Sequence, residues 1–132
     1  MSRADESFFT VVGCMDGRVQ WACARYGKEK FDARFPDTIT EAGIVGIIAK
    51  GPDSSFIENL KFKLSVSIDK HHSKGIIVDG HAECAGNPVD DETHKNDIKK
   101  SVEFISNLIE NKVPVVGVFV ERNGDEWQAR EI

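Results

Sequence analysis

Three short, uninterrupted apolar runs constrain the fold of this chain more than any other feature of its sequence. They are rich in β-branched and aromatic residues, and they cover residues 8–13 (FFTVVG), 75–80 (GIIVDG) and 113–120 (VPVVGVFV). Segments with helical periodicity separate them. Strands that alternate with helices form parallel sheets, because each connection must cross back over one face of the sheet. We therefore predict a three-layer α/β/α fold with a mainly parallel central sheet, in which these runs are the central strands.

Helical spacing of apolar residues marks the first half of the chain. Residues 19–26 predict a short helix that ends at Gly27, and residues 44–48 predict a second helix that ends before Gly51-Pro52. Thr38 to Thr40 could form a brief strand between them.

Two longer helices are predicted in the second half. The first covers residues 55–71, where Ser55 and Glu58 form a capping-box pattern, and the second runs through residues 98–108 after an acidic start. An Asn-Gly turn then precedes an edge strand at residues 126–130. The whole chain, residues 1–132, is predicted to be one domain.

Charge and composition exclude several classes of function. With a net charge of -5 and both signs scattered along the chain, the sequence has no basic footprint of a nucleic-acid binder. No apolar run reaches the roughly 20 residues of a membrane helix, and the polar start MSRADES differs from a secretory signal. We expect a cytoplasmic protein. Its three cysteines are an odd number, which in a reducing compartment favours metal binding or thiol chemistry over disulfides.

Two of those cysteines directly follow predicted core strands. Cys14 ends the first apolar run, and His81 with Cys84 follows the second. In open α/β sheets ligands bind at the carboxyl ends of the strands, where the strand order reverses. If the two strands are neighbours there, the three side chains converge. Two thiolates and one imidazole suit Zn²⁺ and leave one tetrahedral position open, as in a catalytic site.

The pattern Cys14-x-Asp16-x-Arg18 followed by His81-x-x-Cys84 resembles the metal signature of the β-class carbonic anhydrases. The resemblance implies that Cys14, His81 and Cys84 bind zinc and that Asp16 and Arg18 form a catalytic carboxylate–guanidinium pair beside it. It also implies reversible hydration of carbon dioxide to bicarbonate by a metal-bound hydroxide. In that family the Asp either accepts a hydrogen bond from the hydroxide or turns onto the metal, and the chain forms a homodimer or a higher homo-oligomer.

The chain departs from the family pattern on its predicted second strand. Thr40-Glu41 stands where family members carry an Arg-Asn pair, which puts an anion near a bicarbonate site. Two alternatives therefore stay open: hydrolysis of a related heterocumulene such as carbonyl sulfide or carbon disulfide, and a non-catalytic zinc-binding or sensing module. Outside the signature, Cys23 is expected in the core, and three histidines in polar sequence are expected at the surface: His71, His72 and His94.

Overall fold

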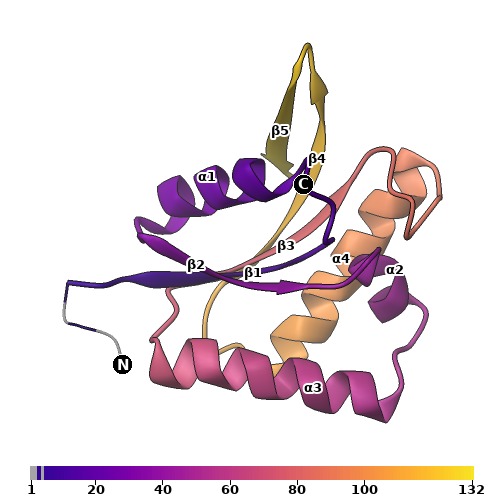
Figure 1. The fold of residues 1–132 in the computed structure, drawn as a ribbon. Helices are drawn as coiled ribbons and strands as arrows, with labels where there is room; N and C mark the ends of the chain where they lie inside the picture. The colour runs from indigo at the N-terminus through magenta and orange to yellow at the C-terminus, as the bar shows by residue number, and fades with distance from the viewer. Residues whose placement is uncertain (1–2, 4) are drawn as a thin grey trace.

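A five-stranded sheet lies between two layers of helices in the computed structural model, which describes residue 3 and residues 5–132 (Figure 1). The strand order is β2-β1-β3-β4-β5; the first four strands are parallel and β5 is antiparallel to β4. The strands are β1 (Phe8–Gly13), β2 (Phe35–Thr40), β3 (Ile76–His81), β4 (Val115–Asn123) and β5 (Glu126–Glu131). The predicted α/β class is confirmed, and the three apolar runs are the central strands.

Helices cover both faces of this sheet. One face carries α1 (Gln20–Phe31), and the other carries α2 (Ile44–Ala49), α3 (Ser54–Ser65) and α4 (Asp91–Leu108) (Figure 1). Alternate residues of a central strand enter different cores: Ile77 packs with the α1 layer, whereas Ile76 and Val78 pack with the other layer. Burial on both faces explains why the central strands read as unbroken apolar runs.

The first helix differs from its prediction at Gly27. We expected the helix to stop there, but α1 continues to Phe31 and is followed by Asp32 in a left-handed conformation with φ 48°. Gly27 instead allows the helix to approach the sheet, because a Cβ at this position would overlap the ring of Phe9. A glycine that serves close packing resembles a helix stop in the sequence.

The long helix predicted over residues 55–71 is divided. Its N-cap is Asp53, whose carboxylate accepts a hydrogen bond from the Phe56 N–H, so the capping box expected at Ser55 is wrong. After α3 the chain continues as a π-helix, Val66–Lys70. The acidic start of α4 is confirmed, with Asp90 as the N-cap.

The strand order reverses between β1 and β3. From β1 the chain crosses through α1 to β2 on one side, and then returns through α2 and α3 on the opposite face to β3 on the other side. The carboxyl ends of β1 and β3 therefore form the switch point at which open α/β sheets bind ligands. Within the part of the chain that the structure covers, no helix is both long and apolar enough to cross a membrane.

Candidate metal centre

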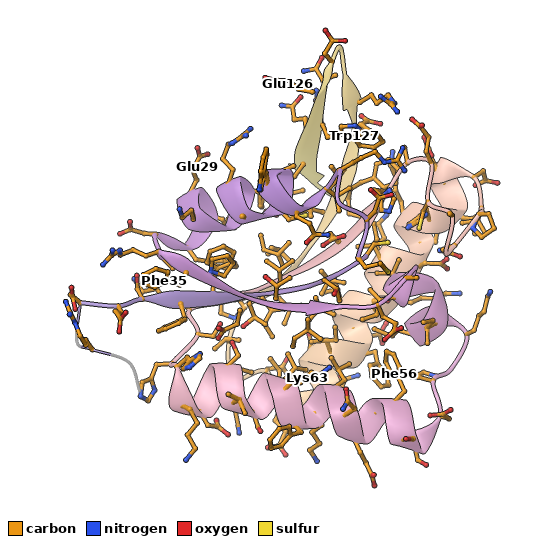
Figure 2. The ribbon with its side chains drawn as sticks, in the orientation of Figure 1. Glu29, Phe35, Phe56, Lys63, Glu126 and Trp127 are labelled. Atoms are coloured by element: carbon orange, nitrogen blue, oxygen red, sulfur yellow. The ribbon has the colours of Figure 1, made fainter. Side chains whose placement is uncertain are left out.

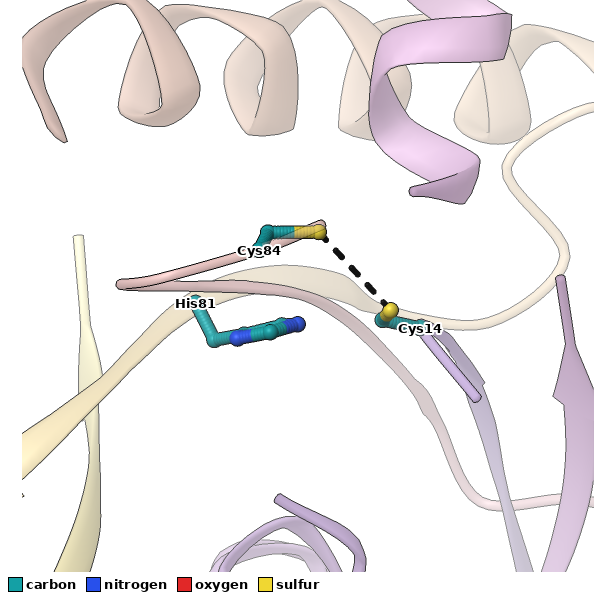
Figure 3. Close-up of side chains that lie close together, drawn as sticks. All are labelled: Cys14, His81 and Cys84. Atoms are coloured by element: carbon teal, nitrogen blue, oxygen red, sulfur yellow. Dashed lines mark hydrogen bonds between the residues drawn. The ribbon is translucent and has the colours of Figure 1, made fainter. Parts of the chain in front are cut away.

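Cys14, His81 and Cys84 meet at this switch point (Figure 3). One ligand atom from each lies within 4.8 Å of the other two, and the two Sγ atoms are 3.9 Å apart. Relative exposure is 5% for Cys14, 1% for His81 and 6% for Cys84. Two sulfurs and one imidazole nitrogen form a borderline-soft donor set suited to zinc.

Backbone and side-chain hydrogen bonds hold Cys14 in the loop after β1. Its N–H donates to Asp79 Oδ1 at 3.2 Å, and its Sγ accepts a hydrogen bond from the Gly43 N–H at 3.4 Å. At the start of α1, the Gln20 amide donates to the carbonyl oxygens of Cys14 and Asp16 at 2.8 and 2.7 Å. The loop is therefore fixed at both of its ends.

His81 presents one ring nitrogen to the cluster. Its Nδ1 lies 2.8 Å from the Ala82 carbonyl oxygen, which can only accept a hydrogen bond, so Nδ1 carries the proton. Its Nε2 is buried and has no hydrogen-bond partner among residues 3 and 5–132. A buried, unpaired lone pair beside two thiols is the arrangement that a metal ion satisfies.

Cys84 lies in a loop that packs directly on the start of α2. Gly43 adopts φ +61°, and a Cβ there would overlap the backbone of Gly86. The buried Asn87 donates from Nδ2 to Asp97 Oδ2 at 3.0 Å and so joins the loop to α4. Both glycines are needed because two backbones touch where Cys84, the third residue of the cluster, is held.

The two thiols differ in acidity. Burial raises the pKa of Cys14, but the neighbouring His81 and the backbone N–H groups of Gly43 and Asp16 outweigh it and lower the pKa to about 7. Burial and the adjacent Cys14 raise the pKa of Cys84. Metal binding requires both thiolates, so uptake of a cation here releases protons and is favoured as pH rises.

Asp16 and Arg18 form a two-point ion pair beside the cluster. Arg18 Nε donates to Asp16 Oδ1 at 3.0 Å, and Nη2 donates to Oδ2 at 2.7 Å. This hydrogen-bonded guanidinium is the main reason that the pKa of Asp16 falls to about 2, so the carboxylate is ionised at neutral pH. Asp16 Oδ2 lies 3.9 Å from His81 Nε2. The structure thus brings together all five signature residues.

The sequence profile of the family described as "Putative carbonic anhydrase" matches residues 4–132. The chain belongs to this family. No curated protein matches it.

Solved carbonic anhydrases share the fold of this family member. A β-carbonic anhydrase from Trichomonas vaginalis has a TM-score of 0.57 at 17% identity, with 98% of this chain and 86% of the other covered. A carbonic anhydrase from Streptococcus mutans has a TM-score of 0.59 at 17% identity, with 94% of this chain and 80% of the other covered. A structure of tetrameric β-carbonic anhydrases from Sordaria macrospora has a TM-score of 0.60 at 12% identity, with 96% of this chain and 81% of the other covered. The central sheet is therefore that of a β-carbonic anhydrase.

Two buried residues of this carbonic anhydrase family member were not assigned to the site from the sequence. Asp79 lies behind Cys14, where burial raises its pKa to about 6. In the sequence, Asp79 is marked only by being the single acidic residue of the otherwise apolar run at residues 75–80. The surface position predicted for His94 is wrong, since the residue is only 1% exposed. The first turn of α4 packs on β3 where Gly80 has no side chain, and the His94 ring fills that space.

The other predicted positions have mixed outcomes. Cys23 is buried in the α1-side core, as expected. His72 is exposed, as expected, but His71 is half-buried, with Nδ1 2.7 Å from Asp37 Oδ2 and its ring stacked on Phe8.

Substituting Gly43 by Ala should lower the free energy of unfolding more than the same change at Gly51. Both positions have positive φ, and left-handed backbone alone costs an alanine about 1–2 kcal/mol. A Cβ at Gly51 meets open space, whereas one at Gly43 overlaps the Gly86 backbone. Urea unfolding of the metal-free protein measures both losses. Equal losses would contradict the packing of α2 on the Cys84 loop.

Proposed function

We propose that this protein catalyses the reversible hydration of carbon dioxide to bicarbonate at a zinc ion held by Cys14, His81 and Cys84. The observation that carries the proposal is a buried Cys-His-Cys cluster with an ionised carboxylate 3.9 Å from its imidazole nitrogen. Membership of the carbonic anhydrase family supports it. Three protein ligands leave a fourth tetrahedral position for water or substrate.

Zinc, when bound, supplies Lewis acidity that makes hydroxide available near neutral pH. The side chains of this chain would orient the reactants. Asp16 Oδ2 accepts a hydrogen bond from the attacking oxygen and aims it at the carbon of carbon dioxide. Arg18 holds that carboxylate ionised and in one orientation through its two-point contact. Asp16 and Arg18 are therefore the proposed catalytic residues.

Glu41 is compatible with this function. It follows β2, and its backbone N–H donates to the Gly13 carbonyl oxygen at 3.2 Å. Its side chain is exposed to solvent. Water screens an exposed charge strongly, so its repulsion of bicarbonate is smaller than that of a buried carboxylate.

We further propose a homodimer or a higher homo-oligomer. Two large apolar side chains are exposed near the signature loop: Met15 is 64% and Trp21 84% accessible. A domain of this size buries additional apolar surface by pairing. The Sordaria macrospora relatives are described as tetrameric. The cytoplasmic location stays a prediction from the sequence.

One zinc ion should bind per chain. Cys14→Ser and Cys84→Ala should each abolish stoichiometric binding, because each removes a thiolate ligand. Cys23→Ala is the matched control: this thiol is also buried, but it lies outside the cluster, and zinc should be retained. Metal analysis of purified proteins measures the ratio. Full zinc content in both cluster variants would refute the ligand assignment.

Carbon dioxide hydration by the zinc-loaded protein should increase from about pH 7 to 9, as the attacking water ionises. Asp16 does not cause this increase, because its pKa of about 2 keeps it ionised throughout. Asp16→Ala should reduce turnover on the order of 10²-fold with zinc retained, and Arg18→Ala should act similarly. Asp125→Ala, at the exposed hairpin tip, is the control.

Stopped-flow assays measure these rates. Hydration no faster than buffer across that pH range would reject carbonic anhydrase activity. Hydrolysis of carbonyl sulfide or carbon disulfide would then identify the heterocumulene alternative, and inactivity there would indicate a non-catalytic zinc module.

Light scattering at tens of micromolar protein, a range in which micromolar associations are populated, should give the mass of a dimer or a larger assembly. Trp21→Lys should shift the distribution toward monomer, because it places a charge in the exposed apolar surface. A native chain that is monomeric at every concentration tested would contradict the oligomer.

A further inference from the structure

The C-terminal hairpin formed by β4 and β5 carries Trp127, which packs against the α1-side core (Figure 2). Trp127 of β5 places its ring edge-on to His81, with ring centroids 6.4 Å apart at 76°. The guanidinium of Arg18 lies over the same indole, 4.8 Å from its centroid. One hairpin residue therefore contacts a metal-cluster residue and the partner of Asp16.

A second hairpin residue is joined to Arg18 through Glu83. Arg122 of β4 donates to Glu83 from Nε at 2.7 Å and from Nη2 at 3.2 Å, and its guanidinium also lies over Trp127, at 4.7 Å. Glu83 stands between His81 and Cys84 in the chain, with φ 59°. Its carboxylate is only 3.6 Å from Arg18 Nη1.

Arg18 is consequently restrained on several sides. One edge of its guanidinium donates to Asp16, Nη2 also donates to the Glu83 carbonyl oxygen at 3.1 Å, and its face is covered by Trp127. Glu83 is a competitor for Arg18, because it offers a second carboxylate within reach. The two hydrogen bonds from Arg122 occupy that competitor and leave Arg18 directed at Asp16.

We propose that Trp127 and Arg122 are positioning residues for the reaction: the indole restrains the Arg18 guanidinium, Arg122 engages Glu83, and together they keep Asp16 in its two-point pair with Arg18. The inference rests on the proposed function, since Asp16 is the carboxylate that would orient the attacking oxygen. It assigns the hairpin to the active site of its own chain. These ion pairs are all at least partly exposed to solvent, and such pairs add little to stability, so their expected effect is on orientation.

The test follows the Arg18 Nε–H by NMR in ¹⁵N-labelled, metal-free protein, with the signal assigned by its loss in Arg18→Lys. Arg122→Met keeps the apolar stem but releases Glu83, and exchange of the Arg18 Nε–H with water should accelerate on the order of 5-fold. Adding Glu83→Gln to Arg122→Met removes the released competitor and should restore slow exchange.

Trp127→Leu should accelerate this exchange by a similar factor and move the signal away from its ring-current position, whereas Trp127→Phe keeps an aromatic face and should retain most of the protection. Arg130→Met on the same hairpin and Phe62→Leu, an exposed aromatic on α3, are matched controls and should change neither exchange nor the signal. If Trp127→Leu fails to fold, the Arg122 series still decides, because Arg122 is exposed.

Unchanged Arg18 exchange in folded Arg122→Met would overturn the proposal, and so would unchanged exchange in folded Trp127→Leu or failure of Glu83→Gln to restore protection. In zinc-loaded protein, turnover should fall and recover in parallel with Arg18 protection; a loss of turnover with unchanged protection would also overturn it. Because the exchange measurement needs neither metal nor activity, it is independent of whether the native protein hydrates carbon dioxide.

Discussion

Parallel pairing between β1 and β3 is the interaction on which the candidate site depends. The register aligns Val12 with Val78, so the loop after β1 and the end of β3 lie side by side at one edge of the sheet. Cys14 and His81 meet there, although they are 67 positions apart in the chain. A shift of one residue would turn His81 to the other face of the sheet and separate the cluster. Burial of the strands on both faces opposes such a shift.

At the same edge of the sheet, several ionisable side chains are buried close together. Two thiols, an imidazole and the Asp79 carboxyl are buried within a small volume, and charging any of them without a partner is costly. A backbone N–H group offsets part of this cost at Cys14, and the proposed metal ion would offset more of it at His81 Nε2, which has no hydrogen-bond partner among the described residues. Asp16 is stabilised differently, because its guanidinium partner holds it ionised at the solvent side. Different interactions therefore stabilise the charges of the buried cluster and the charge of the more exposed Asp16.

The fold shared with other carbonic anhydrases positions the candidate site, whereas side chains of this chain's hairpin surround Arg18. The fold is shared with solved carbonic anhydrases at 12–18% identity, so the same architecture is compatible with very different sequences. The surroundings of Arg18 come from this chain's own hairpin, where Trp127 and Arg122 converge on it. In this chain the environment of the signature pair is thus built from a segment far from the signature in sequence.

The sequence by itself determined the strand and helix alternation, the central strands and the identity of the residues in the Cys-His-Cys cluster, because apolar periodicity and strand-end residues are local signals. It did not reveal that α1 continues beyond Gly27, that Asp53 caps α3, or that His94 is buried, since each depends on which surface packs against that residue. Only the tertiary structure placed Asp79 behind Cys14 and the hairpin beside Arg18. The physical reason is that periodicity along a chain specifies which face of an element is buried, whereas contacts between distant segments are decided by how those faces pack together.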